Sequence, residues 1–248
     1  KLKILLGDLI HSQYINNYAV PLNVGFIAER AKQLFGNEID VKIFKFPEEM
    51  IESIRNDNPD IVGLSNYDWN VNMNKTIFSI TKENNPNTLR VMGGPNIRKG
   101  DKGIKEFLMQ KEFVDTYVFN EGEDGFSDLV RYALSIEKGS IKENLQKNQP
   151  SILNNAYLTD EGFFIKGGVP ESSGEKLIPF PSPWLSGILD PYLNSEKFPL
   201  SPQIETNRNC PFQCTFCTWG TFEDRKIRVF DLDVMLEEIR YIFLNAKS

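Results

Sequence analysis

The chain has 248 residues, of which 40% are hydrophobic and 25% charged, as is usual for a globular protein with one large or two small cores. Its 28 lysines and arginines are outnumbered by 34 aspartates and glutamates, and a net charge of −6 argues against nucleic acid as the main partner. No apolar run approaches the ~18 residues of a membrane span, so we expect no membrane partner.

Residues 1–140 alternate short apolar runs with helical patterns, which predicts a parallel α/β sheet. Five doubly wound strands with helices between them are expected to bind a ligand beyond the carboxyl ends of the strands. The predicted strands are residues 3–7, 40–46, 60–65, 89–92 and 114–119, and the predicted helices are residues 21–35, 47–56, 69–84, 104–110 and 125–137.

A different pattern follows in residues 141–200. Residues 156–166 predict a β-hairpin that turns at Asp-Glu-Gly, and seven prolines from Pro170 to Pro202 predict a semi-rigid connector. A second unit, residues 201–248, is predicted as a strand (203–207), a cysteine-containing loop and a helix capped by Asp231. The apolar stripe of that helix consists of Leu232, Met235, Leu236, Ile239, Ile242 and Phe243.

The three cysteines, Cys210, Cys214 and Cys217, have the spacing C-x3-C-x2-C. Their thiolates suit zinc, copper(I) or an iron–sulfur cluster, and their proximity argues for a reducing, cytoplasmic setting rather than a disulfide framework. Structural zinc normally needs four protein ligands, and the single histidine, His11, is about 200 residues away. Three thiolates on a four-iron four-sulfur cluster leave one iron open for a substrate. Three buried hydrophobic cysteines and an incomplete or two-chain zinc site are the alternatives.

With Phe216 directly before the last cysteine, this motif resembles that of the radical S-adenosylmethionine (SAM) superfamily. The resemblance implies that Cys210, Cys214 and Cys217 hold the cluster, that SAM chelates its open iron, and that Phe216 lies against the adenine. It also implies reductive cleavage of SAM to a 5′-deoxyadenosyl radical that abstracts hydrogen from the substrate. The surrounding strand and helix would be the first βα unit of a partial (β/α)6 barrel.

The sequence departs from this superfamily after the cysteines. Only 31 residues (248 − 217) follow Cys217, and the glycine-rich motif expected after the second barrel strand is absent. The chain also starts at Lys1 rather than at methionine. We therefore expect a fragment of a longer enzyme that is not active by itself.

The order of α/β domain, proline-rich connector and cysteine loop resembles the cobalamin-binding subclass of these enzymes. The resemblance implies that Ser65, Gly93 and Gly94 line the pocket for the corrin and its nucleotide tail, although tight turning also explains the glycines. Residues 8–14 lack the Asp-x-His-x-x-Gly motif of histidine-ligated cobalamin domains, so we interpret His11 as a loop residue. Loss of cobalamin, leaving a domain that only shapes the substrate pocket, is the alternative. The supporting segments are residues 21–22, 60–65, 93–95, 120–123 and 178–183.

The expected function is a cobalamin-dependent radical SAM enzyme that methylates an unactivated carbon, or rearranges or cyclises a small-molecule or peptide substrate. A flavodoxin- or ferredoxin-type reductant is expected as partner. The basic run of Arg225, Lys226 and Arg228 could meet this reductant or an anionic substrate, or remain solvated. Trp69 could pack on a corrin or be a buried aromatic. Glu121 and Glu123 are interpreted as polar pocket groups, with Glu123 alternatively as the start of a helix. A non-catalytic electron-transfer or metal-binding module is the alternative of another class.

Overall fold

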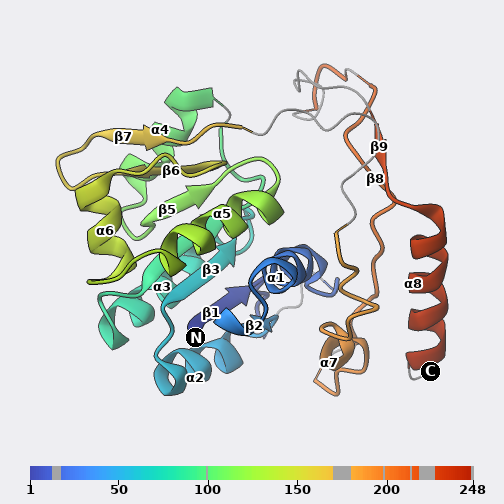
Figure 1. Cartoon of the computed structure of the whole chain (residues 1–248). Helices are drawn as coiled ribbons and strands as arrows, with labels where there is room; N and C mark the ends of the chain where they lie inside the picture. The colour runs from blue at the N-terminus through green and yellow to red at the C-terminus, as the bar shows by residue number, and fades with distance from the viewer. Residues whose placement is uncertain are drawn as a thin grey trace.

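The computed structural model describes residues 1–12, 18–98, 100–169, 180–197, 199–212, 214–217 and 227–246. Its main feature is one seven-stranded sheet in the order β2-β1-β3-β4-β5-β6-β7 (Figure 1). The predicted doubly wound, five-stranded parallel arrangement is confirmed by the parallel pairing of the first five strands. These strands are β1 Leu2–Gly7, β2 Ile39–Phe44, β3 Ile61–Ser65, β4 Leu89–Gly93 and β5 Thr116–Val118.

Helices cover both faces of the sheet, which explains why its strands are nearly continuous apolar runs. Side chains of β1 alternate between the faces: Ile4 and Leu6 belong to one core cluster and Leu5 to the other. The first cluster includes residues of α1 (Leu22–Phe35) and α5 (Gly122–Leu134). The second includes residues of α2 (Pro47–Asp57), α3 (Val71–Asn84) and α4 (Gly100–Gln110). A short 3-10 helix, Gly36–Glu38, follows α1.

The predicted hairpin exists, but it belongs to the sheet rather than to the connector. Its strands β6 (Asn155–Leu158) and β7 (Phe164–Lys166) are antiparallel, and β6 pairs with β5. The sheet therefore continues beyond residue 140, where we expected the first unit to end. Helix α6 (Ile141–Asn148) was not predicted, although it begins with a capping box formed by Ser140 and Glu143.

The second unit contains two short strands and one helix in the described residues. The predicted strand at 203–207 is reduced to β8 (Asn207–Arg208), which pairs with an unpredicted strand, β9 (Arg228–Val229). Helix α8 (Leu232–Asn245) is capped by Asp231, as predicted, because that side chain accepts hydrogen bonds from the N–H groups of residues 233 and 234. Most of its apolar stripe is exposed, namely Leu232, Leu236, Ile239 and Phe243.

Polar contacts fasten α8 to the connector. Ser182 Oγ donates to the buried carboxylate of Glu238 at 2.5 Å, and Tyr241 OH donates to Asp190 at 2.7 Å. The connector includes the short helix α7 (Asp190–Leu193), which lies between the sheet and α8 in Figure 1. Trp184 is fully buried here. Among the described residues, none of the helices has the length and apolarity needed to cross a membrane.

Candidate functional site

The strand order reverses at β1, which has β2 on one side and β3 on the other. In open α/β sheets, ligands bind outside the carboxyl ends of the strands at such a switch point. Two predicted pocket residues are brought together at this edge, because Ser65 and Gly93 are register partners at the ends of β3 and β4. Gly94 follows directly.

A buried ion pair lies at the same edge. Gly7 and Phe44 are register partners, so the next residues, Asp8 and Lys45, lie side by side. Lys45 Nζ is 2.8 Å from Asp8 Oδ2, and both side chains are buried. Sequence reasoning missed this pair, although a charged residue directly after each of two apolar strands was a usable signal.

Ser65 connects this ion pair to a set of amides. Its hydroxyl donates to Asp8 Oδ1 at 2.6 Å, and Asn70 Nδ2 lies 3.4 Å from Ser65 Oγ. Asn74 Nδ2 donates to the Ser65 carbonyl at 2.8 Å. The predicted pocket serine is therefore buried and held by its neighbours. This fixes its position at the carboxyl ends of β1, β2, β3 and β4, the edge of the sheet that we call the crevice.

Gly94 is required by the backbone itself. Its φ is +123°, and a Cβ there would be 2.8 Å from the carbonyl oxygen of Asn66. Asn66 N–H in turn donates to the Gly93 carbonyl at 2.6 Å, and Tyr117 OH donates to the Gly94 carbonyl at 2.6 Å. Burial raises the pKa of Tyr117, which keeps this hydroxyl protonated. Gly94 thus lets two backbone segments, its own and that of Asn66, lie close together, whether or not a ligand binds.

Two buried amide oxygens at this edge, those of Asn66 and Asn74, have no hydrogen-bond partner among the residues that the structure describes. Asn66 Nδ2 donates to the Asn96 carbonyl at 2.8 Å, but its Oδ1 is buried without a hydrogen-bond partner in the structure. A buried, unpaired amide oxygen is unfavourable by about 1–3 kcal/mol. A donor from a bound molecule would satisfy it.

An aromatic pair lies directly after β3. Trp69 stacks on Tyr67 with ring centroids 4.4 Å apart and an interplanar angle of 8°, and 40% of Trp69 is exposed. Asn23 Nδ2 lies 3.4 Å from both Asp8 Oδ1 and Tyr67 OH, which links this pair to the crevice. His11 is exposed, with Nε2 at 3.2 Å from the Trp69 carbonyl.

The cysteines follow β8. Cys210 and Cys217 are half-buried, Cys214 is exposed, and none forms a disulfide. The Cys217 N–H donates to the Cys214 carbonyl at 3.0 Å, so a tight turn brings these two residues together. Phe216 is 91% exposed. Within the described residues, no three His, Cys, Asp or Glu side chains are already arranged around a common metal position.

The donor set nevertheless fits an iron–sulfur cluster. Three free thiols on a short, accessible segment are the ligands that such clusters use. Of the predicted basic run, Arg228 lies in β9 and pairs with Glu121, while Arg225 and Lys226 lie outside the described residues.

The chain thus joins a doubly wound domain, with polar side chains gathered at its switch point, to a loop that carries three free thiols. Residues 15–130 match the family model of the B12-binding domain. The chain is 31% identical to the 2-(S-pantetheinyl)-carbapenam-3-carboxylate methyltransferase of Streptantibioticus cattleyicolor, over 74% of this chain and 25% of that protein. It is 29% identical to the cobalamin-dependent radical SAM methyltransferase TokK of Streptomyces tokunonensis, over 95% of this chain and 34% of that protein.

Among solved structures, the cobalamin-dependent SAM radical enzyme OxsB with aqua-cobalamin and SAM bound matches with a TM-score of 0.68 and 15% identity. That match covers 98% of this chain and 32% of OxsB, and it shows a shared fold. The chain therefore spans a quarter to a third of the length of these relatives. Together, the matches confirm the resemblance to the cobalamin-binding subclass of radical SAM enzymes.

Proposed function

We propose that this chain supplies the cobalamin domain and the cluster-binding loop of a radical SAM methyltransferase that acts on a small or carrier-bound molecule. The observation that carries the proposal is the pairing of a switch-point crevice with three free, closely spaced cysteines in one chain. The names of the relatives, a methyltransferase of a pantetheinyl compound among them, support this substrate class. We further propose that it works in the cytoplasm with a flavodoxin- or ferredoxin-type reductant.

In this proposal, Cys210, Cys214 and Cys217 hold a four-iron four-sulfur cluster and Phe216 lies against the adenine of SAM. When bound, the cluster supplies the electron that cleaves SAM, and cobalamin carries the methyl group. The exposure of Phe216 leaves its ring accessible to a ligand. The turn between Cys214 and Cys217 brings two of the three ligands together.

Ser65, Gly93 and Gly94 are proposed to border the cobalamin site. Gly94 is exposed beside Asn66, and the free Oδ1 of Asn66 offers an acceptor for an amide of the corrin periphery. The exposed face of Trp69 is an apolar surface on which a corrin ring could pack. His11 contacts the main chain of Trp69, which supports cobalamin binding without a histidine ligand.

Anaerobic reconstitution with iron and sulfide tests the cluster. We expect ~4 iron per chain and a broad visible absorption, both lost in Cys214→Ala and retained in Thr215→Ala, which alters the same loop without removing a thiol. One zinc and no iron per chain would contradict the assignment. Addition of SAM should change the electron paramagnetic resonance (EPR) spectrum of the reduced cluster; an unchanged spectrum would favour the electron-transfer module.

Binding of hydroxocobalamin tests the crevice independently. After incubation and desalting, the protein should retain a corrin spectrum. Trp69→Ala should weaken binding, whereas Phe163→Ala, which removes an exposed aromatic from the hairpin turn at the far side of the sheet, should not. A colourless wild-type protein at saturating ligand would refute the cobalamin proposal.

A further inference from the structure

The two short strands of the second unit flank all three cysteines in the sequence. Strands β8 and β9, together called the loop stem, are antiparallel, and Arg208 and Arg228 are register partners in it. Arg208 is two residues before Cys210. Both arginine side chains are only 12% exposed, although their strands have just two residues each.

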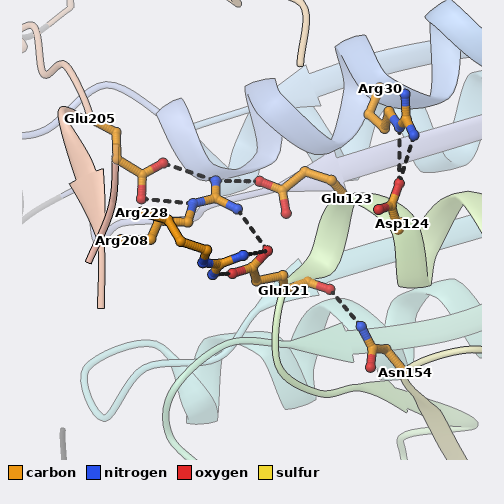
Figure 2. Close-up of polar contacts among 8 residues, drawn as sticks. All are labelled: Arg30, Glu121, Glu123, Asp124, Asn154, Glu205, Arg208 and Arg228. Carbon is orange, nitrogen blue, oxygen red and sulfur yellow. Dashed lines mark hydrogen bonds and ion pairs between the residues drawn. The ribbon is translucent and has the colours of Figure 1, made fainter. Parts of the chain in front are cut away.

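The first domain supplies a carboxylate partner to each of the two arginines, and the second unit adds Glu205. Arg208 Nη2 is 2.5 Å from Glu123 Oε1, and its Nη1 is 3.5 Å from Glu121 Oε2. Arg228 forms an ion pair with the same Glu121 (Figure 2). Glu205 completes the set, at 2.9 Å from Arg208. Because two carboxylates of one turn bind both strands of the stem, the contact restrains its orientation as well as its position.

Aromatic rings surround the Arg208 guanidinium. Its central carbon lies 5.5–5.8 Å from the ring centroids of Phe26, Phe180 and Phe230, and Phe26 stacks on Phe230. These rings come from α1, the connector and the segment between β9 and α8. Such rings attract a cation and exclude water, which strengthens the ion pairs.

Glu121 and Glu123 follow β5, so they lie at the same edge of the sheet as Ser65 and Gly93. The loop stem is thus attached to the edge that contains the crevice. We propose that Glu121 and Glu123, acting through Arg208 and Arg228, are positioning residues that fix the cysteine loop relative to the cobalamin crevice. This inference rests on the proposed function for its consequence, but the attachment itself is a property of the chain alone.

Distances between spin labels test the attachment without any cofactor. With the three cysteines replaced by serine, labels at Lys102→Cys on α4 and Val229→Cys on β9 occupy exposed positions in the two units. We expect a narrow distance distribution that widens in Glu123→Gln, which keeps the shape of the side chain and removes its charge. Glu49→Gln, which breaks an exposed ion pair to Lys197 of the connector, should leave it unchanged.

Protein reconstituted with both cofactors tests whether the attachment fixes the distance between the cluster and cobalamin. After reconstitution with iron, sulfide and hydroxocobalamin and subsequent reduction, the cluster and cob(II)alamin are both paramagnetic and broaden each other's EPR signals. Glu123→Gln should lose this broadening while its iron and corrin contents stay at the wild-type level. Glu121→Gln, whose carboxylate is more exposed, should give the same result if Glu123→Gln does not fold.

The outcomes separate the two proposals. A wild-type protein that binds neither iron nor corrin refutes the proposed function, and the label distances still decide the attachment. If wild type and Glu123→Gln give equal label-to-label distance distributions and the same circular dichroism spectrum, the proposed attachment of the loop stem is wrong. Unchanged broadening in a fully loaded variant overturns the positioning role.

Discussion

Substitution of Lys45 tests how much the buried ion pair at the crevice contributes to the stability of the fold. Its ammonium is fully buried 2.8 Å from Asp8, so Lys45→Met keeps the aliphatic stem and removes only the charge. Asp8 would then remain buried with one strong hydrogen bond, from the Ser65 hydroxyl at 2.6 Å. The variant leaves a buried carboxylate without its counter-charge.

Breaking such a pair from one side lowers the free energy of unfolding by about 3–5 kcal/mol. The Ser65 hydrogen bond still stabilises the charged carboxylate, so we expect about 3 kcal/mol. Replacing both partners, in Asp8→Asn with Lys45→Met, removes the unpaired charge and should recover most of the loss. Lys102→Met is the matched control, because that exposed lysine lies 3.9 Å from Glu106 and should change stability by about 0.5 kcal/mol or less.

Urea denaturation followed by circular dichroism at pH 7 measures these differences, provided that the m-value stays constant among the variants. The reasoning would be refuted if Lys45→Met lay within about 1 kcal/mol of wild type. The reasoning would also be refuted if the double variant lost more stability than Lys45→Met and Asp8→Asn lose when their separate losses are added. In that case the two charges would not stabilise each other.

Three further results are expected from the same urea assay. Burial raises the pKa of Glu238 above its ordinary 4.5, so its stabilising contribution is complete below pH 4.5 and is lost as the pH rises through the folded-state pKa. Glu238→Gln should therefore gain stability relative to wild type as the pH increases from 4.5; a pH-independent difference would contradict this. Gly94→Ala should cost about 3 kcal/mol, because φ is +123° and a backbone oxygen lies 2.8 Å from the new Cβ. Gly162→Ala, with φ +83° and open space, should cost only about 1 kcal/mol, and equal costs would exclude the steric explanation. Phe243→Ser should change stability by less than about 0.5 kcal/mol because 82% of the ring is exposed, and a larger loss would mean that α8 packs differently.

The central sheet could be predicted from the sequence because each of its strands is recognisable from a short stretch of neighbouring residues. Parallel strands that are buried on both faces are continuous apolar runs, and each predicted strand of the first domain matches an observed one. Helix α6 was missed even though its capping box, Ser140 with Glu143, is visible in the sequence. Strands β8 and β9 have two residues each, too few to show any periodicity.

The candidate site was predictable only in part. Ser65 and Gly93 were identified from the resemblance to cobalamin-binding enzymes, and in the structure both lie at strand ends that meet at one edge of the sheet. The charged residues after β1 and β2 are visible in the sequence, but the pairing of Asp8 with Lys45 also requires β1 and β2 to be neighbours, which the strand order decides. Arg228 was interpreted as part of a basic run, whereas it is half-buried against Glu121, an acidic residue far away in the chain.

The signs of the charges at the loop stem follow from the fold. Helix α5 begins beyond the carboxyl end of β5, so its positively polarised amino end points to the crevice edge of the sheet. Acidic residues are favoured there, and Glu121 and Glu123 occupy the N-cap and the first turn. A contact between this edge and another unit is therefore most stable when the first domain contributes acidic residues and the other unit contributes basic ones. Arg208 and Arg228 are the basic residues here. The reversed arrangement would place arginines against the helix amino end, so the pairing chemistry is fixed by the same strand-to-helix direction that creates the crevice.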